Sequence, residues 1–172
     1  SKKNPGYKIF QDRREILTDI SSFKKKFKQN LISNYPLILM EKLKEPVYDL
    51  DILAWKGKSI AVIPRKRVNS AVPNDGHLVI KDNKLINLGK KIISKFKLSW
   101  LYDCDIMYDK KNIPHLLEIN PRPSGSIAVS IAAGIPLIKY LLFLSKGIKI
   151  KKLNMKFNKR IIPYKNLYKI NK

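Results

Sequence analysis

The sequence predicts an α+β fold in which helices flank an antiparallel β-sheet. The main observation is a pair of hairpins, each made of two strand-like segments around a short turn: residues 47–55 with 60–67, and residues 100–109 with 115–120. A helical pattern at residues 84–96 separates the two hairpins, and the first hairpin turns at Lys56-Gly57. Strands joined by tight turns pair antiparallel, whereas a parallel array needs a crossover after every strand.

The chain before the first hairpin predicts one helix and one extended segment. Residues 12–28 are typical of a helix, because Asp12 and Glu15 form a capping box and apolar side chains then recur at helical spacing. The apolar run at residues 35–43 has the character of a strand.

The first strand of the first hairpin alternates clearly. Asp49, Asp51 and Leu53 are predicted to point to one face of the sheet, and Leu50 and Ile52 to the other. The segment after the hairpin, residues 70–77, is rich in turn-forming residues.

Three further helices are expected after this turn segment. The helix at residues 84–96 would place one apolar face on the sheet, made of Leu85, Leu88, Ile92, Ile93 and Phe96. Two short helices are expected at residues 127–133 and 136–144, the second ended by Gly147. The Lys- and Asn-rich tail, residues 148–172, either adds edge strands or stays unpaired.

Length and composition limit the class of protein. A chain of 172 residues suits a single domain. The single cysteine, Cys104, excludes a disulfide framework or a cysteine-built zinc site and suits a reducing cytoplasm. No apolar stretch approaches the roughly 20 residues that span a bilayer. We therefore expect a cytoplasmic protein without membrane contact.

The formal net charge of +23 invites a nucleic-acid interpretation. Six of the 36 basic residues are arginine, whereas bidentate contacts to bases and phosphates favour arginine over lysine. The lysines are mostly dispersed, and their densest groups, at residues 24–28 and 146–156, suit solvated faces. Affinity for nucleic acid, or for a membrane surface, is retained as the rival interpretation.

The second hairpin carries an acidic face in this basic chain. Asp103 and Asp105 fall on one face of their strand, and Glu118 and Asn120 on one face of the next. We expect a register in which Asp105 lies opposite Glu118, and Asp103 opposite Asn120. Like charges directly opposite each other are destabilising, so a cation is expected between them. The alternative is a solvated acidic face paired with lysines.

The expected register depends on the turn, where Asp109 would pair with Pro114. A slip of one residue would move the whole set to the other face. If the register holds, the carboxylate and amide oxygens are hard ligands that suit Mg²⁺ or Mn²⁺ rather than zinc. Magnesium held in this way usually completes its shell with substrate phosphates.

Basic side chains near the acidic hairpin are candidates for phosphate contacts. Arg122 lies two residues after Asn120, and its planar fork suits a phosphate beside a metal; the alternative is a surface arginine. The strand end at residues 65–67 is either solvated or a source of phosphate contacts. His77 is expected merely to follow a turn, with a phosphate contact as the alternative, and His115 is expected to have no role.

These elements together resemble the ATP-grasp family, in particular the type related to the large subunit of carbamoyl-phosphate synthase. Leu117-Glu118-Ile119-Asn120-Pro121-Arg122 resembles the metal-binding strand of the family, and Asp103-Cys104-Asp105 the strand before it. Ile38-Leu39-Met40-Glu41-Lys42-Leu43 resembles the linker strand that holds adenine. Gly6-Tyr7-Lys8-Ile9-Phe10 resembles the exit of the glycine-rich phosphate loop.

The resemblance implies residue roles. Glu118 and Asn120 would bind Mg²⁺ (or Mn²⁺), with Asp105 in the third metal position. Arg122 would bind a transferring phosphate or the acyl phosphate. The implied nucleotide-binding set is Met40, Glu41, Lys42, Leu43 and Asp49.

The resemblance also implies how the chain is divided. Residues 1–43 would be the remnant of the first ATP-grasp subdomain with its linker strand, residues 44–147 the C-terminal subdomain, and residues 148–172 a basic tail. Since the chain begins where the glycine-rich loop should end, the implied ATP-grasp fold is incomplete. The chain is then the C-terminal portion of a longer protein or a truncated homologue.

The family activates a carboxylate as an acyl phosphate and transfers it to an amine or thiol. The resemblance therefore implies the C-terminal part of an ATP- and Mg²⁺-dependent ligase acting on a small carboxylate, catalytically incomplete without the missing N-terminal part. Two rivals stay open: a basic nucleic-acid-binding module, and a non-catalytic ATP-grasp remnant that binds a partner.

Overall fold

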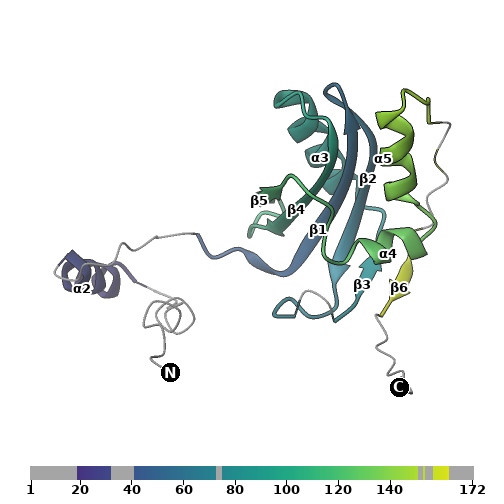
Figure 1. The fold of residues 1–172 in the computed structure, drawn as a ribbon. Coiled ribbons are helices and arrows are strands. Elements are labelled where there is room, and N and C mark those ends of the chain that lie inside the picture. The colour runs from purple at the N-terminus through teal and green to yellow at the C-terminus, as the bar shows by residue number, and fades with distance from the viewer. Residues whose placement is uncertain (1–18, 32–40, 73–74, 151–152, 154–156, 163–172) are drawn as a thin grey trace, which may run out of the picture. The chain divides into compact units, whose positions relative to one another are not determined.

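The computed structural model describes residues 19–31, 41–72, 75–150, 153 and 157–162 (Figure 1). The chain divides into two compact units, residues 1–42 and residues 43–172. The first unit contains helix α2, and the second contains the sheet with its helices. The assignment of residues 1–43 to a subdomain remnant, and of 44–147 to a C-terminal subdomain, stays a prediction. A membrane-crossing helix is absent from the described part of the chain.

Helix α2 (Ile20–Leu31) begins directly after Asp19. The Asp19 carboxylate accepts hydrogen bonds from the backbone N–H of Ser22 and from the hydroxyl groups of Ser21 and Ser22. These bonds lower the pKa of Asp19 to about 2 and cap the helix. The prediction that Asp19 lies inside a helix over residues 12–28 is therefore wrong, and the predicted capping pair, Asp12 with Glu15, lies outside the described residues.

The strands of the second unit form one antiparallel sheet in the order β5-β4-β1-β2-β3-β6 within the described residues. They are β1 (Lys44–Trp55), β2 (Lys58–Arg67), β3 (His77–Val79), β4 (Trp100–Tyr108), β5 (Pro114–Asn120) and β6 (Lys159–Ile161). Both predicted hairpins and the α+β class are confirmed. The short strand β3 begins at the end of the turn-rich segment and was not predicted. The tail adds the edge strand β6.

Helix α3 packs on one face of the sheet, and α4 and α5 pack on the other (Figure 1). Their bounds are α3 (Asn83–Lys95), α4 (Ile127–Ala132) and α5 (Leu137–Ser145), close to the predicted ranges. Asp82 caps α3 by accepting hydrogen bonds from the backbone N–H groups of Lys84 and Leu85. Phe96 stands just after α3 and is 59% exposed, so its predicted burial is wrong.

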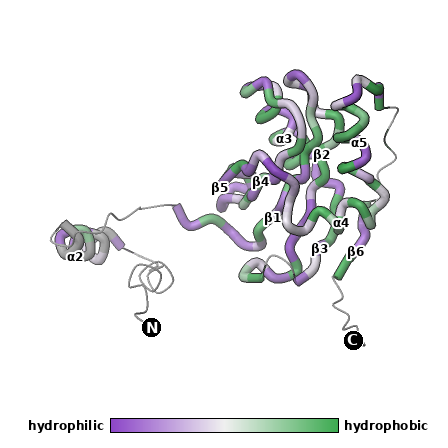
Figure 2. Tube along the Cα trace, in the orientation of Figure 1, coloured by the Kyte–Doolittle hydropathy of each residue, from purple (hydrophilic) through white to green (hydrophobic). Residues whose placement is uncertain are grey.

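The two faces of β1 build two separate hydrophobic clusters, as the alternation predicts. Leu50 and Ile52 pack under α3 together with the buried Cys104. Leu53 packs under α4 and α5. Figure 2 shows the tube of α5 in mostly hydrophobic colours. On the sheet face that α4 and α5 cover, the apolar side chains lie around Leu53. Nearer Asp49, the same face carries polar and charged side chains.

The predicted register of the acidic hairpin is confirmed, although the turn within it pairs differently from the prediction. Asp105 pairs with Glu118, and Asp103 pairs with Asn120. The turn itself pairs Tyr108, not Asp109, with Pro114. A bulge opposite the Asp105–Ile106 step adds one residue to β5 and restores the expected pairing.

Candidate functional site

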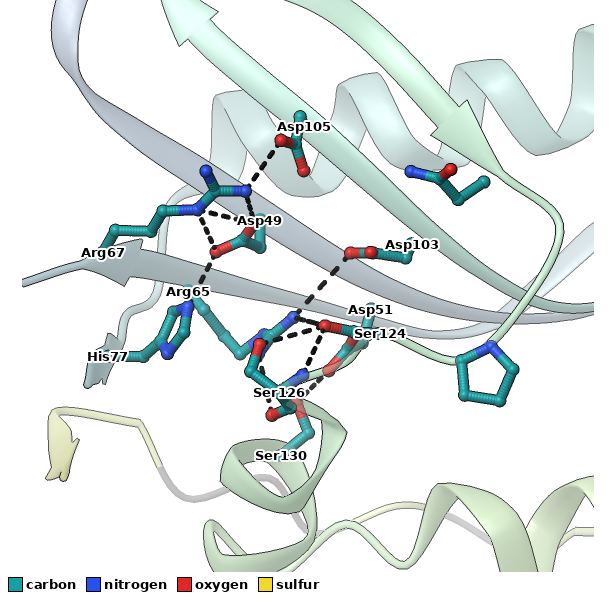
Figure 3. Close-up of polar contacts among 12 residues, drawn as sticks. Asp49, Asp51, Arg65, Arg67, His77, Asp103, Asp105, Ser124, Ser126 and Ser130 are labelled. Carbon is teal, nitrogen blue, oxygen red and sulfur yellow. Dashed lines mark hydrogen bonds and ion pairs between the residues drawn. The ribbon is translucent and has the colours of Figure 1, made fainter. Parts of the chain in front are cut away.

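The polar half of this sheet face carries carboxylates on three neighbouring strands. Figure 3 shows four of them, Asp49, Asp51, Asp103 and Asp105. Asp49 of β1 lies directly opposite Asp105 of β4, and the next pair along the same strands is Asp51 with Asp103. Glu118 of β5 extends the first row beyond Asp105. Like charges at directly opposed positions repel each other, so the fold must supply cations to this face.

Arg67, at the end of β2, supplies the first cation. Its guanidinium donates to the Asp49 carboxylate through Nε at 3.0 Å and to Asp105 Oδ2 through NH2 at 2.7 Å. His77 of β3 is fully buried, and its Nε2 lies 2.9 Å from Asp49 Oδ2. The prediction that His77 merely follows a turn is therefore wrong.

Arg65, two residues earlier on β2, is fully buried and supplies the second cation. Its NH2 donates to Asp51 Oδ1 and to Ser124 Oγ, each at 3.0 Å. Its NH1 donates to the backbone carbonyl of Ser126 at 3.0 Å and to the hydroxyl of Ser126. Ser130 of α4 donates to the other oxygen of Asp51. A solvated strand end at this position is excluded.

The carboxylates of this network differ in their tendency to ionise. Burial raises the pKa of Asp103 to about 6, and the neighbouring Asp51 and Asp49 add to the shift. Burial also raises the pKa of Asp51 and, despite the bonds from Arg67, that of Asp105. For Asp49, hydrogen bonds from His77 and Arg67 outweigh burial and lower the pKa. Asp49 is therefore the carboxylate of the group that these hydrogen bonds hold in its ionised form.

Arg122 and the two β5 side chains form the rim of the network. Asn120 Nδ2 donates to Glu118 Oε1 at 2.8 Å, and Glu118 is exposed. Arg122 NH1 donates to Asp103 Oδ2 at 3.2 Å, while 55% of the Arg122 side chain stays exposed. The structure therefore brings the predicted metal residues and Arg122 to one sheet face, with Glu118 and Arg122 open to solvent.

The predicted metal set suits a hard divalent ion. Asp105 and Glu118 face each other across the ladder, and Asn120 lies on the same face. Asp105 also contacts Arg67, so its carboxylate has one oxygen engaged by a cation already. A solvated acidic face is excluded for Asp103, which is 6% exposed and paired with arginines rather than lysines.

The predicted nucleotide residues are only partly described. Met40 lies outside the described residues. Glu41 and Lys42 are exposed and precede β1 without forming the expected strand, and Leu43 is half-buried. Asp49 is buried in the network, with both oxygens engaged by Arg67 and His77. Nucleotide contact by these residues stays a prediction.

The cationic half of the network could have been recognised in the sequence. Arg65 and Arg67 share a face of β2, as Asp49 and Asp51 share a face of β1, and the two strands belong to one predicted hairpin. In the observed register Asp49 lies opposite Arg65, and each arginine bonds to the carboxylate on the diagonal. Two carboxylates and two arginines at a spacing of two residues on adjacent strands signal a cross-strand charge network. His77 left no such signal, because β3 has three residues and follows a turn-rich segment.

Residues 33–166 match the model of a protein family described as ATP-grasp in the biosynthetic pathway with Ter operon. The search among curated proteins finds no match.

Among solved structures, the chain is similar to N5-carboxyaminoimidazole synthetase from Staphylococcus aureus, with a TM-score of 0.54 and 13% identity, over 88% of this chain and 41% of the synthetase. It is also similar to L-amino acid ligase from Bacillus licheniformis, with a TM-score of 0.45 and 11% identity, over 73% of this chain and 34% of the ligase. At 13% identity, the likeness to the synthetase concerns the fold alone. The chain spans less than half the length of either enzyme.

Proposed function

Because the chain belongs to the ATP-grasp family, we propose that it is the C-terminal part of an ATP-dependent ligase. The ligase activates a small carboxylate as an acyl phosphate and joins it to an amine or a thiol. ATP and Mg²⁺ (or Mn²⁺) are the proposed cofactors. The observation that carries the proposal is the meeting of Asp105, Glu118 and Asn120 on one sheet face, in the register that a shared divalent ion requires.

The residues of the chain have distinct roles in this proposal. Asp105, Glu118 and Asn120 hold a divalent ion, which neutralises phosphate oxygens when bound. The exposed fork of Arg122 binds the transferring phosphate or the acyl phosphate beside it. Phosphoryl transfer needs mainly positioning and charge neutralisation, which this arrangement provides.

Several finer points belong to the same proposal. The element Leu117-Glu118-Ile119-Asn120-Pro121-Arg122 supports the type related to the large subunit of carbamoyl-phosphate synthase. Residues 40–43 and Asp49 are kept as the nucleotide-binding set. The upstream part of the same protein completes the site, and the single buried Cys104 supports a cytoplasmic location.

The rival function, a basic nucleic-acid-binding module, draws support from the net charge of +23. Simple retention of ATP cannot separate the two, because lysines attract any polyphosphate. Attraction by lysines falls steeply with salt and needs no divalent ion. Binding at the carboxylates is strengthened by Mg²⁺, since the ion bridges them to the phosphates.

Glu118→Gln separates the two functions by the sign of its effect. In the full-length parent protein, we expect it to weaken Mg-ATP binding several-fold at moderate salt, because a metal ligand is lost, and to leave duplex DNA binding unchanged or slightly tighter. The measurement is a titration of both ligands with and without Mg²⁺. The matched control is Glu45→Gln, which makes the same charge change at an exposed site beside Tyr48 and Tyr108, on the other sheet face. Unchanged or tighter Mg-ATP binding by Glu118→Gln would favour the nucleic-acid module.

A further inference from the structure

A second group of carboxylates lies deeper than the proposed metal set. One oxygen from each of Asp49, Asp103 and Asp105 lies within 4.8 Å of the others. Oxygens bound to one divalent ion at about 2.0–2.6 Å are spaced on this scale. We call these three residues the inner cluster, and Asp105, Glu118 and Asn120 the outer set. The two groups share Asp105.

A guanidinium group already occupies the inner cluster. Arg67 NH2 bonds to Asp49 and to Asp105 Oδ2, so a single nitrogen bridges two of the three carboxylates (Figure 3). Arg67 Nε adds a contact to each Asp49 oxygen, at 3.0 and 3.1 Å. Only 10% of the Arg67 side chain is exposed. This is the position that a divalent ion between Asp49 and Asp105 would need.

The backbone holds Arg67 in place. Arg67 pairs with His77 across the β2–β3 ladder, and His77 in turn contacts the Asp49 carboxylate. Arg67, Asp49 and His77 therefore each contact the other two, and they lie on the three neighbouring strands β2, β1 and β3. Such a tethered cation loses little freedom when it pairs, in contrast to an ion recruited from solution.

Asp103, the third member of the inner cluster, shows that nearby cations do not fully balance the negative charge of the cluster. Asp103 Oδ1 is buried and has no hydrogen-bond partner in the described structure. The cation nearest to this oxygen is Arg65 NH2, at 3.9 Å, whereas the other oxygen of Asp103 accepts a hydrogen bond from Arg122 NH1 at 3.2 Å. A buried carboxylate oxygen without a donor is costly, so the cluster keeps an affinity for positive charge beyond what Arg67 supplies.

We propose that Arg67 is the resident cation of the inner cluster and confines divalent ions to the outer set. The part about the outer set rests on the proposed function, whereas the part about Arg67 does not. Arg67 places a fixed positive charge on Asp105, the carboxylate that both groups share. Removing that charge while keeping the three carboxylates turns the inner cluster into a divalent-ion site.

The test is a gain of binding by Arg67→Gln. The 172-residue chain is titrated with Mn²⁺ alone, without nucleotide, and bound Mn²⁺ is followed by electron paramagnetic resonance. We expect Arg67→Gln to bind one more Mn²⁺ than the unmodified chain, at least tenfold tighter than any Mn²⁺ that the unmodified chain binds. Adding Asp49→Asn to this variant should abolish the gain.

Two matched variants show whether the gain comes from the vacated position. Arg67→Lys keeps a tethered cation and should bind no additional Mn²⁺. Arg160→Gln makes the same charge change at an exposed position on β6 and should also have no effect. No gain in folded Arg67→Gln, or an equal gain in Arg160→Gln, would overturn the proposal.

A third variant tests the proposal in the presence of Arg67, in case Arg67→Gln does not fold. If Arg67 rather than a metal is the partner of Asp49, Asp49→Asn alone should change Mn²⁺ affinity by less than threefold. A tenfold loss would identify Asp49 as a metal ligand and overturn the proposal. Because none of these titrations contains nucleotide, they give an answer even if Mg-ATP binding, and with it the proposed function, fails.

Discussion

Arg65 NH1 donates hydrogen bonds to both the backbone carbonyl and the hydroxyl of Ser126, a residue 61 positions further along the chain. The segment that carries Arg122 is thereby joined to the centre of the sheet. Arg65 NH2 bonds to Asp51 and Ser124, so Arg65 holds the loop at both Ser124 and Ser126. The position of Arg122 beside Asp103 depends on this buried arginine.

Arg65→Lys should therefore loosen the loop while keeping the charge. A lysine ammonium cannot reproduce the planar fork that reaches Asp51, Ser124 and Ser126 together. We expect the free energy of unfolding to fall by about 2 kcal/mol, since more than one buried hydrogen bond is lost. Urea denaturation measures the effect. Lys66→Ala is the control: this exposed neighbour on β2 should change stability by less than about 0.5 kcal/mol. Equal effects of the two variants would contradict the structural role of Arg65.

Gly89→Ala should destabilise the protein although alanine is the better helix former. A Cβ at Gly89 would lie 2.7 Å from Val62 Cγ1 and 3.2 Å from Ile52 Cδ1, so α3 would have to move off the sheet. We expect a loss of about 1–2 kcal/mol, because overpacking outweighs a helix-propensity gain of about 1 kcal/mol.

Chemical denaturation of Gly89→Ala is best compared with two further variants. Gly125→Ala is the control, because no atom lies within 4 Å of its added Cβ and it should be nearly neutral. Adding Val62→Ala to Gly89→Ala should cost less than the sum of the two single changes, since the clash is relieved. Additive losses would mean that α3 and β2 are not in close contact at this point.

The strands of the two hairpins could be predicted because their alternation and turns are local properties of the sequence. Lys56 and Gly57 both adopt positive φ in the predicted turn, and the predicted C-terminal Gly147 does the same after α5. The start of α2 was misjudged because Asp19 can stand inside a helix or cap one, and only its bonds to Ser21 and Ser22 decide. β3 could not be predicted, since three residues give too short a pattern.

The free energy of unfolding should depend on pH because of Asp103. Its pKa is raised to about 6 by burial and by Asp51 and Asp49, against an unfolded value near 3.9. A raised carboxyl pKa means that the folded state binds more protons than the unfolded state between these two values. The contribution of Asp103 to the free energy of unfolding therefore falls as pH rises from about 4 to about 6.

Asp103→Asn should remove this dependence. Relative to the unmodified protein, the variant should gain stability between pH 4 and pH 6, on the order of 1 kcal/mol once solvent screening is allowed for, and the difference should then level off. Urea unfolding of both proteins at pH 4, 6 and 8, with a chelator present, measures it. A difference that is constant over this range, or that shrinks with rising pH, would contradict the burial of this carboxyl group.

Cys104 should be inert in the folded protein. Its side chain is buried under α3, and burial together with Asp103 and Asp105 raises the pKa of the thiol to about 12. The thiolate, which is the reactive form, is then nearly absent at pH 8. We expect a thiol reagent to modify Cys104 at least a hundredfold more slowly in the native protein than in urea. Fast modification of native protein would show that α3 opens from the sheet.

The anionic half of the site could be predicted better than the cationic half. Asp105, Glu118 and Asn120 follow from alternation within one hairpin, and the bulge in β5 compensates for the difference in the turn pairing, so their predicted pairing holds. The partners of Asp49 come from β2 and β3, and those of Asp51 also include Ser130 of α4. A local pattern cannot bring together side chains 79 positions apart, such as Asp51 and Ser130, which depend on how helices cover the sheet.

The arrangement of the charge network has a consequence for the order of folding. Its members come from β1, β2, β3, β4 and the segment around α4. Asp51 is 14 positions from Arg65, in the same hairpin, but 79 positions from Ser130 of α4. Contacts between residues so distant in sequence close large loops and form slowly. The first hairpin can bring Arg65 and Arg67 to Asp51 and Asp49 early. Asp103 and Asp105 are added with the second hairpin, and Ser124, Ser126 and Ser130 only after it. The charge network therefore begins to form with the first hairpin and is completed only when α4 and the segment before it dock on the sheet.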